Sequence, residues 1–142
     1  MRILFMGTPE FAVPCFDVLN SEYEIIGAFT KVDKPNMRGK KIKFTPVKEY
    51  ALEHNIPVYQ PNSLKTEETQ NIIKELNPDL IVVVAYGKIL PKEIIDMPKY
   101  GVINVHSSLL PKYRGAAPIN AALIHGEKES GVTIMYIAEE LD

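Results

Sequence analysis

The sequence has one cysteine, no tryptophan and no long apolar run. A single thiol excludes an internal disulfide and is typical of a protein from a reducing compartment. No stretch approaches the roughly 18 apolar residues that span a bilayer, and the start of the chain shows no signal-peptide cleavage site. These absences predict a cytoplasmic protein that makes no use of a membrane.

What is present is the composition of an ordinary globular domain. The chain has 142 residues, of which 46% are hydrophobic and 24% charged, an average balance for one soluble domain. The net charge of −2 is unevenly distributed, because residues 31–48 hold seven cationic side chains and a single acid, Asp33. Such a segment indicates either a polyanionic partner or a solvated, lysine-rich loop, and charge alone does not decide between them.

Apolar runs typical of strands alternate with helical patterns along the chain. We expect strands over 2–6, 24–30, 57–59, 80–85, 102–105 and 132–137. We expect helices over 11–20, 45–54, 66–76 and 118–125, with a short helical piece after Pro91. Pro35 and Gly39 predict that the basic segment lacks regular structure. Alternating strands and helices, with a central strand that is apolar on both faces, predict an α/β fold: a Rossmann-like, doubly wound, mostly parallel sheet with helices on both faces.

The densest polar cluster follows the strand expected over 102–105. Asn104 and His106 flank Val105, and on an extended strand two residues separated by one point to the same side. In doubly wound sheets, ligands bind at the carboxyl ends of the strands. An amide and an imidazole that face one point can stabilise an oxyanion in acyl transfer. Equally, Asn104 could cap a loop and His106 could be a half-buried structural residue.

The remaining reactive side chains favour structural roles. Ser107 and Ser108 lack a GxSxG context, so we expect them to bind local backbone or a ligand and not to act as nucleophiles. Cys15 lies in an apolar helical pattern and is expected to be an inert core residue. His54 and His125 lie near expected helix C-termini, where the helix dipole favours them. With no Cys/His cluster, no Walker loop and no GxGxxG, the sequence predicts neither a metal site nor a nicotinamide or ATP role.

Five segments carry a resemblance to a known family: GTPEFAVP, RGKK, VVVAYGKILP, NVHSSLLPKYRGAAPIN and SGVTIM. They resemble the methionyl-tRNA formyltransferase family from the first strand to the last residue. Asn-x-His followed by Ser-Leu-Leu-Pro marks the wider folate-dependent formyltransferase superfamily, and YRGAAPIN with GTPEFAVP marks the tRNA enzymes. The resemblance implies a metal-free enzyme of translation initiation. It would transfer a formyl group from 10-formyltetrahydrofolate to the α-amino group of methionyl initiator tRNA.

The resemblance also implies roles for individual residues. The catalytic residues would be Asn104, His106 and Asp142. The residues that bind the pterin end of the folate would be Ser108, Leu109, Leu110 and Pro111. The residues that bind tRNA would be Arg38, Lys40, Lys41 and Lys43.

The family further implies a domain organisation. Residues 1–142 would form the N-terminal catalytic and folate-binding domain, truncated and without the family's barrel-like tRNA-binding domain. We expect such a piece to be monomeric and to have little activity by itself. Two other functions stay open: a sugar-nucleotide N-formyltransferase of the same superfamily, and a non-catalytic α/β ligand-binding module.

Overall fold

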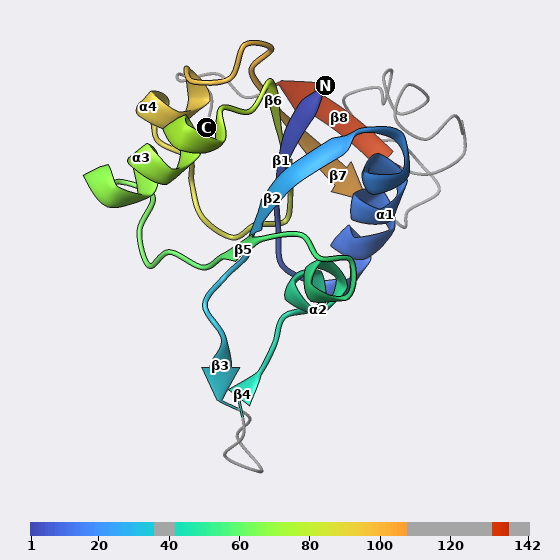
Figure 1. The fold of residues 1–142 in the computed structure, drawn as a ribbon. Helices are drawn as coiled ribbons and strands as arrows, with labels where there is room; N and C mark the ends of the chain where they lie inside the picture. The colour runs from blue at the N-terminus through green and yellow to red at the C-terminus, as the bar shows by residue number, and fades with distance from the viewer. Residues whose placement is uncertain (36–41, 108–131, 137–142) are drawn as a thin grey trace.

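The computed structural model describes residues 1–35, 42–107 and 132–136, which form a twisted sheet between two layers of helices (Figure 1). Five strands run parallel, and the sixth, β8, is antiparallel to its neighbour β7. From one edge of the sheet to the other, the strands are β5 (Val58–Tyr59), β2 (Glu24–Phe29), β1 (Arg2–Gly7), β6 (Leu80–Val84), β7 (Val102–Ser107) and β8 (Val132–Tyr136).

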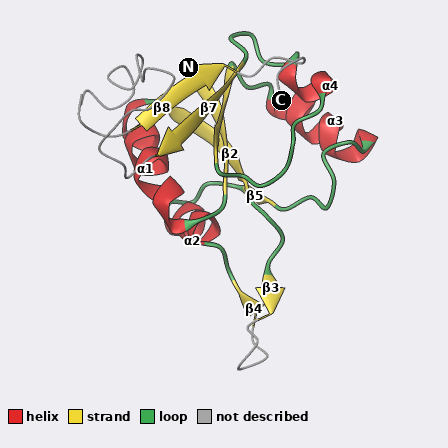
Figure 2. Cartoon of the chain, turned by 180° about the vertical axis from the view of Figure 1, so that it is seen from behind, coloured by secondary structure: helices red, strands yellow, loops and turns green. Residues whose placement is uncertain are grey.

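The helices cover both faces of this sheet. The short 3₁₀ helix η1 (Glu10–Ala12), α1 (Val13–Glu22) and α2 (Pro46–Glu53) lie on one face, and α3 (Glu67–Leu76) and α4 (Lys92–Ile95) on the other (Figure 2). Successive side chains of β1 point to alternate layers. Ile3 and Phe5 pack toward α1 and α2, and Leu4 and Met6 pack toward α3 and α4. Burial on both faces is what the apolar runs of parallel strands predict.

The order of the strands is that of a doubly wound sheet. The chain moves outward from β1 to β2 and β5, then returns to the other side of β1 to add β6 and β7. The strand order therefore reverses between β1 and β6, where folds of this kind bind ligands. At this point the Thr8 hydroxyl donates a hydrogen bond to the Tyr86 carbonyl over 2.9 Å. The predicted fold class is confirmed.

Most of the predicted elements are confirmed because their signals are local. Thr45 caps α2 by accepting a hydrogen bond from the Lys48 N–H over 3.1 Å, and Pro46 occupies the first turn. Thr66 caps α3 in the same way through the Thr69 N–H over 3.2 Å. The helix expected over 118–125 lies outside the described residues.

Two predictions about secondary structure were wrong. The ends of the basic segment are regular, since β3 (Lys34–Pro35) pairs with β4 (Ile42–Lys43) in a two-stranded antiparallel ribbon. Proline is tolerated there because a two-stranded ribbon has only edge strands. The strand expected to end at residue 105 continues to Ser107, because its last residues pair with β8. Each pairing depends on a partner segment outside the predicted element, with 6 intervening residues for β3 and 24 for β7, so neither shows in the local pattern.

Candidate active site

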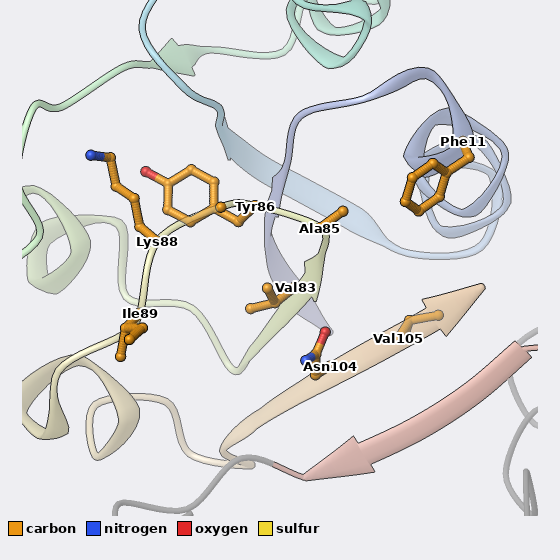
Figure 3. A pocket seen from close by; sticks show the side chains of 9 residues that line it. Phe11, Val83, Ala85, Tyr86, Lys88, Ile89, Asn104 and Val105 are labelled. Atoms are coloured by element: carbon orange, nitrogen blue, oxygen red, sulfur yellow. The ribbon is translucent and has the colours of Figure 1, made fainter. Parts of the chain in front are cut away.

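Asn104 lies inside β7 and lines a cavity of about 470 Å³, which we call the Asn104 cavity. Its neighbours in the sheet are Val83 of β6 and Met135 of β8. Ile103 and Val105 on either side are buried among the residues that pack against α1 and α2. Asn104 therefore belongs to the opposite face, and its amide points from β7 toward the end of β6 (Figure 3).

His106 follows two residues later on the same strand. Its backbone is still extended and pairs with Thr133 of β8. The strand is thus continuous from Asn104 to His106. The prediction that their amide and imidazole face one point requires this extended backbone. The third residue of the predicted catalytic set, Asp142, lies outside the described residues, as do the predicted folate residues 108–111.

The other walls of the Asn104 cavity come from the segment that follows β6. The lining residues are Phe11, Val83, Ala85, Tyr86, Gly87, Lys88, Ile89, Asn104 and Val105. Ile89 is 90% exposed and Phe11 is 52% exposed, so apolar side chains stand at the rim. Binding sites for small organic molecules are typically of this size and mostly apolar, with few polar groups. The cavity therefore has the size and the mostly apolar lining of a site for a small organic molecule, with Asn104 among its polar groups.

The backbone of this segment has an uncommon shape. Ala85 has φ +52° and Gly87 has φ +98°, both in the left-handed region that non-glycine residues seldom adopt. Between them, Tyr86 is buried, and burial raises the pKa of its hydroxyl to about 12. Among the described residues, that hydroxyl has no hydrogen-bond partner. The Lys88 ammonium donates to the Asn62 carbonyl over 3.0 Å. The hydrogen bond from Lys88 ties this wall of the cavity to the segment between β5 and α3.

Sequence reasoning missed this wall. In the sequence, the segment VVVAYGKILP served only to mark the family resemblance, and no site residue was predicted in it. A signal was available, because residues directly after a central parallel strand lie at the edge where such folds bind ligands. That signal was applied to the strand that contains Asn104 and not to its neighbour.

Of the predicted tRNA-binding residues, the structure describes only Lys43. It lies on β4, exposed, at the root of the ribbon that projects from the body (Figure 1). Arg38, Lys40 and Lys41 lie outside the described residues. The ribbon leaves the body after β2, so it starts at the same edge of the sheet as the segment after β6.

The other reactive side chains have structural surroundings. Cys15 is buried in the core, as predicted, and burial raises the pKa of its thiol to about 12. His54 ends α2, with its ring stacked on Tyr50 at 3.9 Å between centroids. Within the described ranges, no three His, Cys, Asp or Glu residues are grouped to hold a metal ion. No described helix is long and apolar enough to cross a membrane.

The sequence profile of the formyl transferase family matches residues 1–142, the whole chain. The chain belongs to this family. It is 63% identical over 142 residues to a methionyl-tRNA formyltransferase from Fusobacterium nucleatum, in a match that covers 100% of this chain and 46% of that protein. The match to a second such protein, from Alkaliphilus oremlandii, also covers 46% of its length. The chain thus spans about half the length of the curated relatives it matches.

Solved structures of formyl transferases share the fold. A phosphoribosylglycinamide formyltransferase from Streptococcus pneumoniae matches 99% of this chain and 76% of its own, with a TM-score of 0.62 and 22% identity. At that identity the likeness shows the fold alone. A formyltetrahydrofolate deformylase from Pseudomonas syringae matches 99% of this chain and 47% of its own, with a TM-score of 0.59 and 26% identity.

Proposed function

We propose that this chain forms the catalytic, folate-binding part of a methionyl-tRNA formyltransferase. The observation that carries the proposal is the 63% identity, over the whole chain, to a protein of that name. The formyl donor is 10-formyltetrahydrofolate, and the acceptor is the α-amino group of methionine on initiator tRNA. The product serves translation initiation, and the site of action is the cytoplasm. We propose that the protein acts as a monomer, without a metal.

The Asn104 cavity supports this chemistry. In formyl transfer, the neutral amine attacks the formyl carbon of the donor and the carbonyl oxygen becomes an oxyanion. Asn104 donates a hydrogen bond to that oxyanion, assisted by protonated His106. Asp142 holds the imidazole. When the intermediate collapses, the bond from the formyl carbon to N10 of the folate breaks, and the proton lost by the amine is delivered to N10.

Two parts of the chain share the binding of folate in this proposal. The pterin end enters the Asn104 cavity, where Gly87 and the apolar rim at Ile89 form one wall. Residues 108–111, assigned to folate by resemblance, follow directly on Ser107, the last residue of β7. The volume of about 470 Å³ lies within the range of small-molecule sites.

The test is a formyl-transfer assay on the complete gene product with charged initiator tRNA and 10-formyltetrahydrofolate. Asn104→Ala should lower kcat by roughly two to three powers of ten, the usual effect of removing one oxyanion donor, while folate affinity changes far less. His106→Ala should lower kcat on a similar scale. The matched control is Asn71→Ala, an exposed asparagine of α3. Near-normal turnover by Asn104→Ala would overturn the assignment.

The same assay separates the two other functions. A sugar-nucleotide N-formyltransferase would use an amino-sugar nucleotide in preference to charged tRNA. A non-catalytic binding module would bind folate and show no transfer, with or without Asn104.

A further inference from the structure

Part of the wall of the Asn104 cavity is shaped by backbone and not by large side chains. This part is residues 85–89, which we call the 85–89 segment, and all five residues line the cavity. Ala85 and Gly87 have little or no side chain. The ring of Tyr86 points away from Asn104 and is buried in the apolar cluster on the α3 and α4 side (Figure 3). The course of the backbone therefore sets the shape of this wall.

The backbone of the 85–89 segment needs support from other parts of the chain. The strand β6 ends at Val84, so the hydrogen bonds of the sheet stop before the segment begins. Ala85 has φ +52° and Gly87 has φ +98°. A left-handed alanine is strained, and such a conformation persists only where the surrounding structure determines it. The contacts that hold this backbone thus decide whether the wall keeps its shape.

Two hydrogen bonds reach the 85–89 segment from elsewhere in the described part of the chain. The Lys88 ammonium donates to the Asn62 carbonyl over 3.0 Å, but this bond holds the end of a long side chain. The Thr8 hydroxyl donates to the Tyr86 carbonyl over 2.9 Å and so holds the backbone itself. Because a peptide group is rigid and planar, a bond to this carbonyl fixes the orientation of the whole peptide that joins Tyr86 to the next residue.

Thr8 can reach Tyr86 because the ends of β1 and β6 approach each other closely. A Cβ on Gly7, the last residue of β1, would lie 2.8 Å from the Val84 carbonyl oxygen. Real Cβ atoms do not come this close to a backbone oxygen, so glycine allows the approach without a shift of either strand. The Val47 N–H of α2 donates to the Thr8 carbonyl over 3.5 Å. Thr8 is thus held at the point where the strand order reverses.

The Thr8 hydroxyl supports the same wall by a second route, through Lys31. It accepts a hydrogen bond from the Lys31 N–H over 3.4 Å. The Lys31 side chain lies over Gly87, where an added Cβ would be 2.5 Å from Cε and 2.9 Å from Nζ. One hydroxyl therefore joins the chain after β1 to the chain after β2 and after β6. Its loss would remove a support of the wall both at Tyr86 and at Gly87.

The described residues that line the Asn104 cavity do not include Thr8. Thr8 can therefore influence a ligand in that cavity only through its neighbours. We propose that Thr8 is a positioning residue for the formyl donor: through the Tyr86 carbonyl, it holds the 85–89 segment in the conformation that binds 10-formyltetrahydrofolate. This inference deepens the proposed function and rests on it for the identity of the ligand. It adds Thr8, which the family resemblance left without a role.

The test compares wild type with Thr8→Val in the complete gene product, because valine removes the hydroxyl and keeps the shape of the side chain. Formyl transfer is measured with saturating charged tRNA and varied 10-formyltetrahydrofolate. The KM for the folate should rise roughly two- to tenfold, the scale on which one hydrogen bond changes an equilibrium. The kcat should fall by less than about threefold, since Asn104 and His106 are unchanged. Asn104→Ala should show the opposite split between KM and kcat.

Isothermal titration calorimetry with 10-formyltetrahydrofolate, without tRNA, shows whether the change in KM is a change in affinity. Thr8→Ser keeps the hydroxyl and should restore the wild-type Kd. The matched control is Thr66→Val, which removes the hydroxyl that caps α3 and so costs stability far from the Asn104 cavity. It should lower the Tm and leave the Kd unchanged. Should Thr8→Val fail to fold, Thr8→Ala is measured in its place.

Two results would overturn the inference. The first is a wild-type KM and Kd for Thr8→Val, as expected of the control. The second is a Kd for Thr8→Ser as weak as that of Thr8→Val, because the hydroxyl would then not be the cause.

The outcome is separable from that of the proposed function, since calorimetry needs no formyl transfer. Normal transfer to charged tRNA with no effect of Thr8→Val would leave the function standing and remove this inference. A wild-type protein that transfers no formyl group, yet loses folate affinity in Thr8→Val and regains it in Thr8→Ser, would do the reverse.

Discussion

The space above Gly87 is filled by the side chain of Lys31, and the backbone there has φ +98°. A side chain at this position meets both steric contact with Lys31 and the strain of a left-handed conformation. Gly87 thus lines the Asn104 cavity and leaves room for the side chain of Lys31.

We predict that Gly87→Ala lowers the free energy of unfolding by roughly 1–3 kcal/mol, the cost of a strained left-handed residue. The matched control is Ala85→Gly, two residues earlier, where φ is already +52° and the mutation removes a Cβ from a left-handed residue. Urea denaturation of both variants checks the prediction, and equal stability of Gly87→Ala and wild type would contradict it.

Single residues also show what the sequence could and could not reveal about the site. Asn104 was found because it belongs to the polar cluster at the end of a core strand, one residue from His106 on the same side, and the structure places it in a cavity. The roles proposed for Asn104 and His106 in catalysis stay predictions. The part of the cavity wall at Ala85 and Gly87 was missed because the rule that ligands bind after central strands was applied to β7 and not to β6. The left-handed conformation of Ala85 itself carries no mark in the sequence.

At the scale of secondary structure, the β3–β4 ribbon is attached to the body by a cluster of polar side chains. The Lys48 ammonium of α2 bonds both Asp33, before β3, and Gln60, after β5, over 2.7 Å and 3.0 Å. Partial burial acts to raise the pKa of Asp33, but the hydrogen bonds from Lys48 and Gln60 outweigh it and hold that pKa below the ordinary value of 3.8. Ionised Asp33 is thus favoured by the folded state.

This cluster predicts a dependence of stability on pH. Because the folded-state pKa of Asp33 lies below the unfolded value, its contribution is present above about pH 4 and is lost as the pH falls through the folded-state pKa. Asp33→Asn should lower the free energy of unfolding by roughly 1–2 kcal/mol near neutral pH, and the difference from wild type should shrink below about pH 4. Urea titrations across this range give the measurement. A pH-independent difference would show that the charge of Asp33 is not responsible.

The control for the pH series is Asp96→Asn. Asp96 pairs with Lys92 over 2.9 Å on the exposed surface of α4, with side chains 58% and 60% exposed. Exposed pairs of this kind contribute about 0–1 kcal/mol, so this variant should stay close to wild type at every pH.

Elements were predictable from sequence where their causes are local. Thr45 and Thr66 cap helices that begin directly after them, and both helices were predicted from the sequence. The β3–β4 ribbon was missed because each of its strands has only two residues, and Pro35 in the first of them was taken as a break in regular structure. The end of β7 was missed because it depends on β8, whose first residue, Val132, follows Ser107 by 25 positions and pairs with it.

At the scale of the whole molecule, one sheet separates two apolar clusters that share no buried residue. The cluster on the α1 and α2 side includes the rings of Phe5 and Phe16, stacked at 4.2 Å between centroids. The cluster on the α3 and α4 side includes Ile73 and Tyr86. The strands β1 and β6 supply side chains to both clusters. Loss of either layer of helices would therefore expose strands on which the other layer also packs.

We predict that the clusters contribute independently to stability and yet unfold together. Ile3→Val in the first cluster and Ile73→Val in the second each remove one buried methyl group, since both side chains are at most 1% exposed. Each should lower the free energy of unfolding by about 0.5–1.5 kcal/mol, and the double variant by their sum to within roughly 0.5 kcal/mol, as for sites without common contacts. Ile89→Val, at 90% exposure, is the control and should change stability by less than about 0.5 kcal/mol.

Urea unfolding followed by far-ultraviolet circular dichroism and by near-ultraviolet tyrosine signals tests this arrangement. One midpoint for both signals is expected in each variant, because the shared strands make the sheet a single cooperative unit. Neither Ile3 nor Ile73 lines the Asn104 cavity, so folate binding should fall only with the folded fraction in either variant. Two separate midpoints, or a large coupling energy between Ile3 and Ile73, would mean that the two faces of the sheet do not behave as described.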